Sequence, residues 1–219
     1  MLGGCRASQP DTLYGTTVCN HIYTQFAGRK SGFRPGALDL DGFVNFEGAE
    51  AVETSILFLF TVYNREPRTL HLPAYYEGIA REIFQVMQVE RTLVSADAAP
   101  TGASVVQVQP LSRSLRLTVT TIGADLPSVV TATLAEHPAC PAVQICLPLE
   151  QAAAPWAAAR LRAAGFFFSG ILPLWAESDC LVLQRTLRPP AFEKLALYDP
   201  FAKRLLAFIR EDRAAIAGP

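Results

Sequence analysis

The chain has 219 residues, of which 50% are hydrophobic and 18% are charged, and its formal net charge is −1. A chain of this length can bury a proper hydrophobic core, and it lacks the basic excess with which proteins neutralise nucleic-acid phosphates. The longest apolar stretch, SILFLFTVY, is far too short to cross a bilayer. These totals predict a globular protein that binds no nucleic acid and does not enter a membrane.

The five cysteines indicate a reducing compartment. Their number is odd, their spacing is irregular, and no CxxC pair occurs among Cys5, Cys19, Cys140, Cys146 and Cys180. In a chain this long, such cysteines are typical of reduced and mostly buried thiols, so we expect a cytoplasmic protein. A histidine lies two residues after Cys19, but no second pair lies at ligand spacing, and we expect no metal site.

The first 53 residues carry the weakest pattern. Over residues 16–26, apolar side chains recur from Cys19 at the spacing i, i+3, i+4, i+7, which predicts a helix. Residues 37–48 are typical of a short strand or a hairpin, with turns at Gly42 and Gly48.

From residue 55 onward the elements are clearer. The continuous apolar run at 55–63 is typical of a strand that is covered on both faces. Further on, Ile79, Ile83 and Phe84 share one face of an amphipathic helix. We predict strands at 55–63, 68–72, 91–95 and 104–109, and a helix at 74–88.

The rest of the chain alternates between strands and helices. Gly165 is placed to end a helix, and three adjacent phenylalanines, Phe166 to Phe168, follow it. Because neighbouring strand residues point to opposite faces, we expect these rings to fill both sides of a buried sheet. We predict strands at 114–122, 142–147, 166–172 and 180–186, and helices at 125–137, 150–164 and 199–216.

The two halves of the chain match at a fixed offset. Pro73 and Pro148 are 75 residues apart, as are Gln109 and Gln184, and a helix at about 124–139 is additional in the second half. This pattern suggests two degenerate tandem copies that share one sheet. We therefore predict an α/β fold with a mixed, largely buried sheet flanked by helices.

The order of elements from 114 to 186, with AAARLRAAGFFFSGIL ending a helix and opening a strand, resembles the C-terminal half of the GNAT acyltransferase fold. The stretches LHLP, AGFFFSGILP and CLVLQ are similar to the GNAT-like domains that accompany bacterial anti-sigma-factor or histidine-kinase-type ATPase domains. The resemblance implies an N-terminal GNAT-like half at 1–110, a C-terminal GNAT-like half at 111–187, and an amphipathic helix within 188–219 that packs on the domain.

The same resemblance implies a site for an acyl-CoA. In GNAT enzymes, backbone N–H groups at a helix N-terminus hold the CoA pyrophosphate. The corresponding stretch here is IGADLPS, so the expected cofactor-binding residues are Thr121, Ile122, Gly123 and Ala124. The stretch departs from the family motif, because it keeps only the glycine at 123 and adds a negative charge at Asp125.

The candidate catalytic residues are His71, Tyr75 and His21. His71 lies at the C-terminal end of a predicted strand, where α/β proteins often bind ligands, and Tyr75 opens the next helix. His21 lies in a polar group that could form one wall of a pocket, with the imidazole as a base. Ordinary packing or surface positions are the alternative for all three. The general-acid tyrosine of the family would fall near Leu161, which cannot transfer a proton.

Two functions remain open from the sequence. The first is an acyl-CoA-dependent N-acyltransferase, with acetyl-CoA or another acyl-CoA as the ligand and an unknown amine as the acceptor. The second is a catalytically inactive GNAT-fold sensor or protein-interaction module in bacterial signalling, whose partner would be a protein. The incomplete phosphate loop and the missing tyrosine favour the second function, and the resemblance favours the first.

Overall fold

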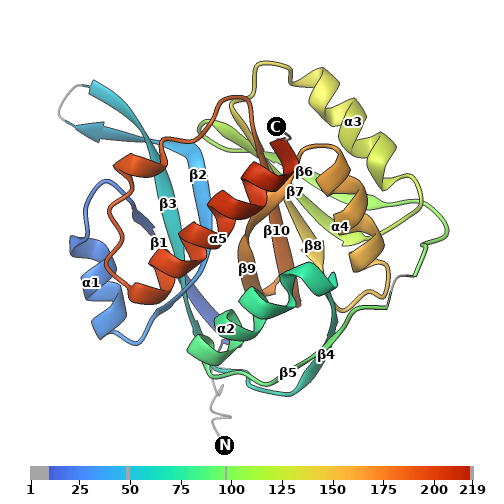
Figure 1. Cartoon of the computed structure of the whole chain (residues 1–219), viewed down its shortest axis with the longest axis horizontal. Helices are drawn as coiled ribbons and strands as arrows, with labels where there is room; N and C mark the ends of the chain where they lie inside the picture. Colours follow the sequence, from blue (N-terminus) through green and yellow to red (C-terminus); the bar gives the residue numbers. More distant parts are fainter. Residues whose placement is uncertain (1–9, 48–49, 97, 218–219) are drawn as a thin grey trace, which may run out of the picture.

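The computed structural model describes residues 10–47, 50–96 and 98–217, which form an α/β protein built on one large mixed sheet (Figure 1). This confirms the predicted fold class. In spatial order, the strands of the sheet are β1 (Thr12–Val18), β3 (Glu50–Val62), β2 (Arg34–Glu47), β9 (Phe167–Trp175), β10 (Ser178–Thr186), β8 (Ala142–Pro148), β7 (Ser114–Thr121) and β6 (Val105–Pro110).

Neighbouring strands in this sheet are antiparallel except β7 and β8, which are parallel and are joined by the crossover helix α3 (Leu126–Glu136). A second, two-stranded parallel sheet contains β4 (Arg68–His71) and β5 (Arg91–Val94). These two strands are joined by α2 (Glu77–Met87), which follows a short 3-10 helix at Ala74–Tyr76.

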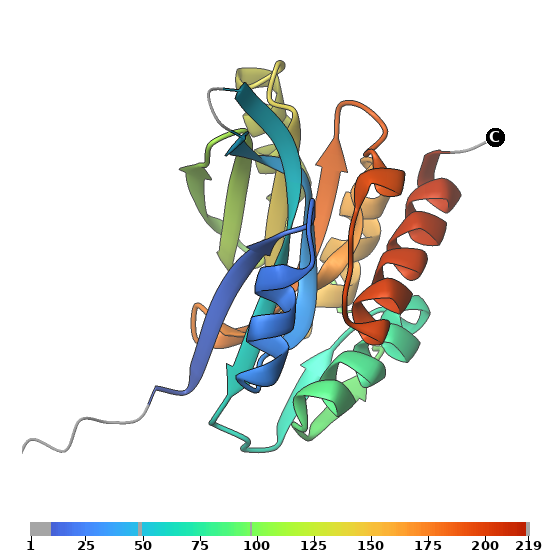
Figure 2. The ribbon, with the colours of Figure 1, turned by 90° about the vertical axis from the view of Figure 1, so that its left-hand side faces the viewer.

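Helices cover one face of the large sheet. Figure 2 shows α2 and α5 (Pro200–Ala217) together on this side, and α5 packs on β9 and β2. The helix α4 (Ala154–Ala163) packs on β8 and lies beside α3. The short helix α1 (Tyr23–Lys30) lies next to β1 at the opposite edge of the molecule (Figure 1). A second 3-10 turn, Phe192–Lys194, precedes α5.

The three adjacent phenylalanines are buried as predicted, with at most 2% of each residue exposed. Phe168 packs on the helical side, where its ring lies 4.9 Å from Tyr76 and 5.2 Å from Phe208. Gly165, in front of them, has a φ of +87°, the left-handed conformation that a glycine helix cap requires.

The large sheet has a seam between β2 and β9. The only Cα pair joining these strands in the described residues is Ala37 with Gly170. Side chains of β9 and β10 form hydrogen bonds with the backbone of β2 in place of the usual ladder between strands. The Gln184 amide binds both the N–H and the carbonyl of Leu40, and the Ser169 hydroxyl donates to the carbonyl of Leu38. The strands β1, β3 and β2 thus join the other five through side chains as much as through backbone.

The sheet is strongly curled. Four strands separate β3 from β7 in the strand order, which in a flat sheet would place them more than about 20 Å apart. Instead, the Arg116 guanidinium on β7 lies 5.3 Å from the ring of Phe58 on β3, and Arg113 pairs with Glu53 at 2.6 Å. The inner face of the curled sheet is therefore enclosed by the sheet itself.

The prediction of a helix at residues 16–26 is wrong. Residues 12–18 form β1, and the helix begins only at Tyr23. Its buried side chain is the polar Gln25, whose amide donates to the carbonyls of Val18 and Ala196. The apolar spacing was misleading because Ile22 and Phe26 are exposed in the fold.

The tandem repeat is reproduced in the order of elements but not in their pairing. At the offset of 75 residues, β4 corresponds to β8, β5 to β9 and β6 to β10. In the second half, β10 lies between β8 and β9 in the large sheet. In the first half, the corresponding strand β6 pairs with β7 at the edge of the large sheet, and β4 pairs directly with β5. The two segments therefore do not form equivalent sheets.

Within the described residues, none of the helices combines the length and the apolar character that a membrane span requires.

Candidate functional site

The end of β7, where the acyl-CoA site was predicted, is closed by the side chain of Gln151. The parallel pairing of β7 with β8 stops at Thr118 and Cys146, although β7 continues to Thr121. Beyond that point, the Gln151 amide donates to the carbonyl of Thr120 at 2.7 Å and accepts from the N–H of Ile122 at 2.9 Å. A primary amide thus occupies the place of a strand partner.

The loop at Gly102–Ser104 closes the rest of the predicted phosphate-binding segment. The N–H of Gly123 donates to the Ser104 hydroxyl at 2.9 Å, and the N–H of Ala124 donates to the carbonyl of Gly102 at 3.0 Å. In return, the N–H of Ser104 donates to the Asp125 carboxylate at 2.7 Å. Hydrogen bonds from Ser104 hold the pKa of Asp125 below its usual value, so the carboxylate stays charged.

Space is as limited as hydrogen bonding around Gly123. A Cβ at this position would lie 2.3 Å from the backbone of Ala103 and 2.4 Å from that of Ser104. The glycine is therefore required by the close approach of the chain's own loop, and the same approach occupies the position that a pyrophosphate would need. The residues of the predicted cofactor site lie together, but their donors at 122, 123 and 124 are all used.

His71 lies close to this closed end. The backbone N–H of His71 donates to the carbonyl of Leu149 at 2.6 Å, and Leu149 precedes Gln151 by two residues. The Nδ1 atom of His71 is buried and has no hydrogen-bond partner in the described part of the chain. The segment from Leu149 to Gln151 thus lies between His71 and the end of β7.

Tyr75 and His21 do not join His71. Tyr75 is 47% exposed and contacts Tyr76 and the Arg162 guanidinium, which lies 5.2 Å from its ring. His21 packs beside Tyr23 with ring centroids 5.6 Å apart. Among the residues that the structure describes, no hydrogen bond, ion pair or ring contact joins any two of the three predicted catalytic residues.

The tyrosine with polar partners is Tyr76, which is fully buried. Its hydroxyl donates to Asp212 at 3.0 Å, and Asp212 also pairs with Arg162 and accepts from the N–H of Phe168 at 2.7 Å. Burial raises the pKa of Tyr76 far above its usual value. This network attaches α5 to the sheet, and its inaccessibility to solvent argues against proton transfer to a substrate.

A polar cluster that the sequence analysis missed lies inside the curled sheet. The Gln184 amide donates to Asp39 at 3.2 Å, and the Arg116 guanidinium donates to the Gln144 carbonyl at 3.0 and 3.2 Å. Burial raises the pKa of Asp39 to about 7, while the charge of Arg116 opposes that shift. Glutamines inside the apolar runs AVQICL and CLVLQRT were the available signal. The cluster fills the interior, so its role is packing and support of the seam.

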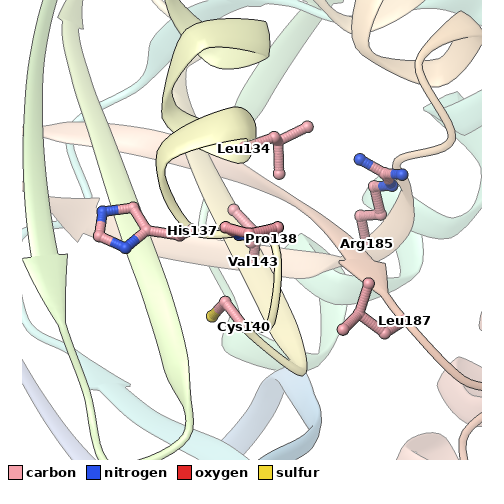
Figure 3. A pocket seen from close by; sticks show the side chains of 7 residues that line it. All are labelled: Leu134, His137, Pro138, Cys140, Val143, Arg185 and Leu187. Atoms are coloured by element: carbon pink, nitrogen blue, oxygen red, sulfur yellow. The ribbon is translucent and has the colours of Figure 1, made fainter.

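An open surface pocket of about 440 Å³ is lined by Tyr75, Arg162 and Ala215. Two further pockets lie around Leu187, just beyond the C-terminal end of β10. One of about 230 Å³ is lined by Leu134 of α3, Val143 of β8, Arg185 of β10 and Leu187 (Figure 3). Figure 3 also shows the His137 ring directed away from Arg185. A neighbouring pocket of about 290 Å³ shares Leu187. No residue from Thr121 to Ala124 lines either of these pockets.

In the described ranges, no three or more His, Cys, Asp or Glu side chains are grouped so that they could hold a metal ion. The four described cysteines are free thiols. Burial raises the pKa of Cys19 to about 12 and that of Cys146 to about 11, so these thiols are poor nucleophiles.

We compared the chain with family models, with curated proteins and with solved structures, and none of the three comparisons found a match.

Proposed function

We propose that this chain is a catalytically inactive α/β module that acts by binding a partner protein, in a fold derived from the GNAT acyltransferases. The order β7, α3, β8, α4, β9 and β10 supports the relationship, since it is the order of elements on which the sequence resemblance rests. The proposed setting is bacterial signalling in the cytoplasm, which follows from that resemblance and from the reduced state expected of the cysteines.

The observation that carries the proposal is the use of three consecutive amide donors inside the protein. Anion capture at a helix N-terminus depends on unpaired N–H groups that point at the ligand. Here Ile122 donates to Gln151, Gly123 to Ser104 and Ala124 to Gly102. A pyrophosphate at this position would also face the charged carboxylate of Asp125 and would have to displace the Gly102–Ser104 loop.

The candidate catalytic residues support the same conclusion. A general base must lie within hydrogen-bond reach of the proton that it removes, and a general acid within reach of the leaving group. His71 lies at the closed end of β7, Tyr75 contacts α4, and His21 lies beside α1. An acyl transfer would therefore lack an assembled acid–base pair.

The acyltransferase is the second candidate, and the separation of β7 from β8 favours it. The two strands are unpaired beyond Thr118 and Cys146, and the group between them is the side chain of Gln151 rather than another strand. A side chain can rotate away at low cost, so an acyl-CoA that entered between the strands would have two backbone groups to bind.

Calorimetric titration with acetyl-CoA, with CoA as the control ligand, separates the two candidates. We expect no saturable binding at millimolar acetyl-CoA and no shift in the melting temperature. Saturable micromolar binding of acetyl-CoA would overturn the proposal and support the acyltransferase. The variant Gln151→Ala belongs in the same experiment, because it frees the N–H of Ile122 and the carbonyl of Thr120 without adding bulk.

A further inference from the structure

The end of β10 presents a ridge with a pocket on either side. The ridge is the run Arg185–Arg188, in which Leu187 is 57% exposed. Leu187 lines both adjacent pockets, of about 230 and 290 Å³, and its N–H is fixed by the carbonyl of Pro141 at 2.9 Å. The backbone of the ridge is therefore held in place while its leucine points into solvent.

The two charges on this ridge have no partner. Neither the Arg185 nor the Arg188 side chain forms a hydrogen bond, an ion pair or a ring contact with any residue in the described ranges. The carboxylates nearby are Glu53, which pairs with Arg113 at 2.6 Å, and Asp41, which accepts from two uncharged donors, the N–H of Ala191 at 3.4 Å and the Ser55 hydroxyl at 3.3 Å. The Glu53–Arg113 pair is neutral, so the charges of Arg185 and Arg188 exceed the single negative charge of Asp41, and the surface is net positive.

The surface continues beyond Thr186 toward α5. A third pocket, of about 130 Å³, is lined by Thr186, Phe167 and Arg213. The Arg213 guanidinium contacts the ring of Phe167 at 5.9 Å and has no ion pair in the part of the chain that the structure describes. Three pockets therefore follow one another along the end of β10, and each has an arginine without a carboxylate partner in its lining.

The shape of this surface fits an extended polypeptide better than a compact metabolite. Each pocket is smaller than the roughly 300–1,000 Å³ of a usual small-molecule site. They are separated by Leu187 and Thr186, so one compact ligand would fill only one of them. Separate side chains of one peptide can enter separate pockets. Arginine is also one of the residues that are enriched at protein interfaces.

We propose that this surface, defined by Arg185–Arg188 and Arg213, docks an acidic peptide segment of a partner protein whose apolar side chains enter the pockets on either side of Leu187. The inference rests on the proposed function and names the chemistry of the partner. Carboxylates of the peptide pair with Arg185, Arg188 and Arg213, and these charge-assisted hydrogen bonds set the register in which the apolar side chains enter.

The test is a selection of random peptides displayed on phage against the full chain, with counter-selection against the double variant Arg185→Glu/Arg188→Glu. We expect the recovered sequences to be enriched in Asp and Glu alternating with large apolar residues. Recovered peptides are then measured by fluorescence anisotropy. Binding should weaken at least tenfold in Arg185→Glu/Arg188→Glu, fall in Leu187→Ser and decrease with added salt.

Arg65→Glu is the matched control, since Arg65 is exposed, also lacks a partner in the described residues and lies outside this surface. The Arg65→Glu variant should bind the peptides with the same affinity as the unmodified chain. Recovery of no peptides beyond those that also bind the double variant would overturn the proposal. So would peptides without acidic residues, or acidic peptides that bind equally well when their apolar residues are replaced by serine, which is the behaviour of a plain anion site.

The two proposals fail in different ways. Acetyl-CoA binding contradicts the inactive module, whatever the peptide selection yields. A failed selection together with no acetyl-CoA binding overturns the docking surface at the end of β10 and leaves the inactive module in place.

Discussion

Two ends of the same sheet differ in what their polar groups do. At the end of β7, the N–H groups of residues 122–124 bind the chain's own atoms, and a loop packs directly on Gly123. At the end of β10, the guanidinium groups of Arg185 and Arg188 bind nothing within the described residues, and Leu187 is exposed between two pockets. The polar groups at the end of β7 are therefore satisfied within the protein, whereas the arginine side chains at the end of β10 are not.

The difference between the two ends shows that a sequence motif alone does not establish whether backbone donors are free to bind a ligand. Capacity to bind an anion depends on donors that are unpaired in the folded protein. The backbone donors at residues 122–124 are paired within the protein, whereas the guanidinium groups of Arg185 and Arg188 have no partner in the described residues. Substitutions at one end of the sheet at a time test this difference.

The largest effect is expected for Gly123→Ala. The new Cβ would lie 2.3 to 2.4 Å from the backbone of the Gly102–Ser104 loop, so the loop must move. We expect a loss of about 1–3 kcal/mol in the free energy of unfolding, measured with urea. Gly78→Ala is the control, because nothing lies within 4 Å of its Cβ position on α2. Equal stabilities for the two variants would contradict the closed loop.

A smaller loss is expected for Gln151→Ala. The substitution removes the amide that satisfies the carbonyl of Thr120 and the N–H of Ile122, and water can replace it only in part. The free energy of unfolding should fall by about 1 kcal/mol. Gln85→Ala, at an exposed position of α2, is the matched control and should change stability little. If the two variants behave alike, the bridge at the end of β7 contributes nothing.

The other end of the comparison should tolerate charge reversal. Arg185→Glu/Arg188→Glu breaks no interaction within the described residues, so the free energy of unfolding should change by no more than about 0.5 kcal/mol. Thermal and urea denaturation measure this. A loss as large as that of Gly123→Ala would mean that these arginines stabilise the fold and are not free for a partner.

The smallest signal is the titration of Asp125. Hydrogen bonds from Ser104 stabilise its charged form and lower its pKa from the ordinary value of 3.8. A lowered pKa adds stability that is present above the unfolded pKa and is lost as the pH falls through the folded one. Carboxyl NMR should therefore give a pKa below 3.8 for Asp125. A value at or above that would show that the contact with Ser104 does not form in solution.

The sequence predicted most of the second half of the fold because its elements have strong local signals. The buried run at Phe166–Phe168 after Gly165 is one example, and β8, with every residue buried, is another. The first half was harder, because β1 has no clean alternation and the inward residue of α1 is a glutamine that binds carbonyls distant in the chain. Such a partner is fixed only by the tertiary fold.

The sequence placed the candidate residues at strand ends, but it did not show which of their backbone groups bind other parts of the chain. The residues Thr121–Ala124 and His71 lie around the Leu149–Gln151 segment, as the strand ends implied. No local pattern in the sequence indicates that the N–H of Gly123 donates to the hydroxyl of Ser104, which lies 19 residues earlier. Such a contact depends on where the connection between β6 and the preceding strand folds back on the sheet. The free arginines at the end of β10 carry no motif for the same reason.

The most direct test of the account is the hydrogen exchange of the amides of Ile122, Gly123 and Ala124, followed by NMR with and without acetyl-CoA. We expect all three amides to be protected from exchange, because each donates within the protein, and to keep their chemical shifts when acetyl-CoA is added. Exchange at the rate of an unstructured chain, with shifts that move on addition of acetyl-CoA, would contradict the closed site.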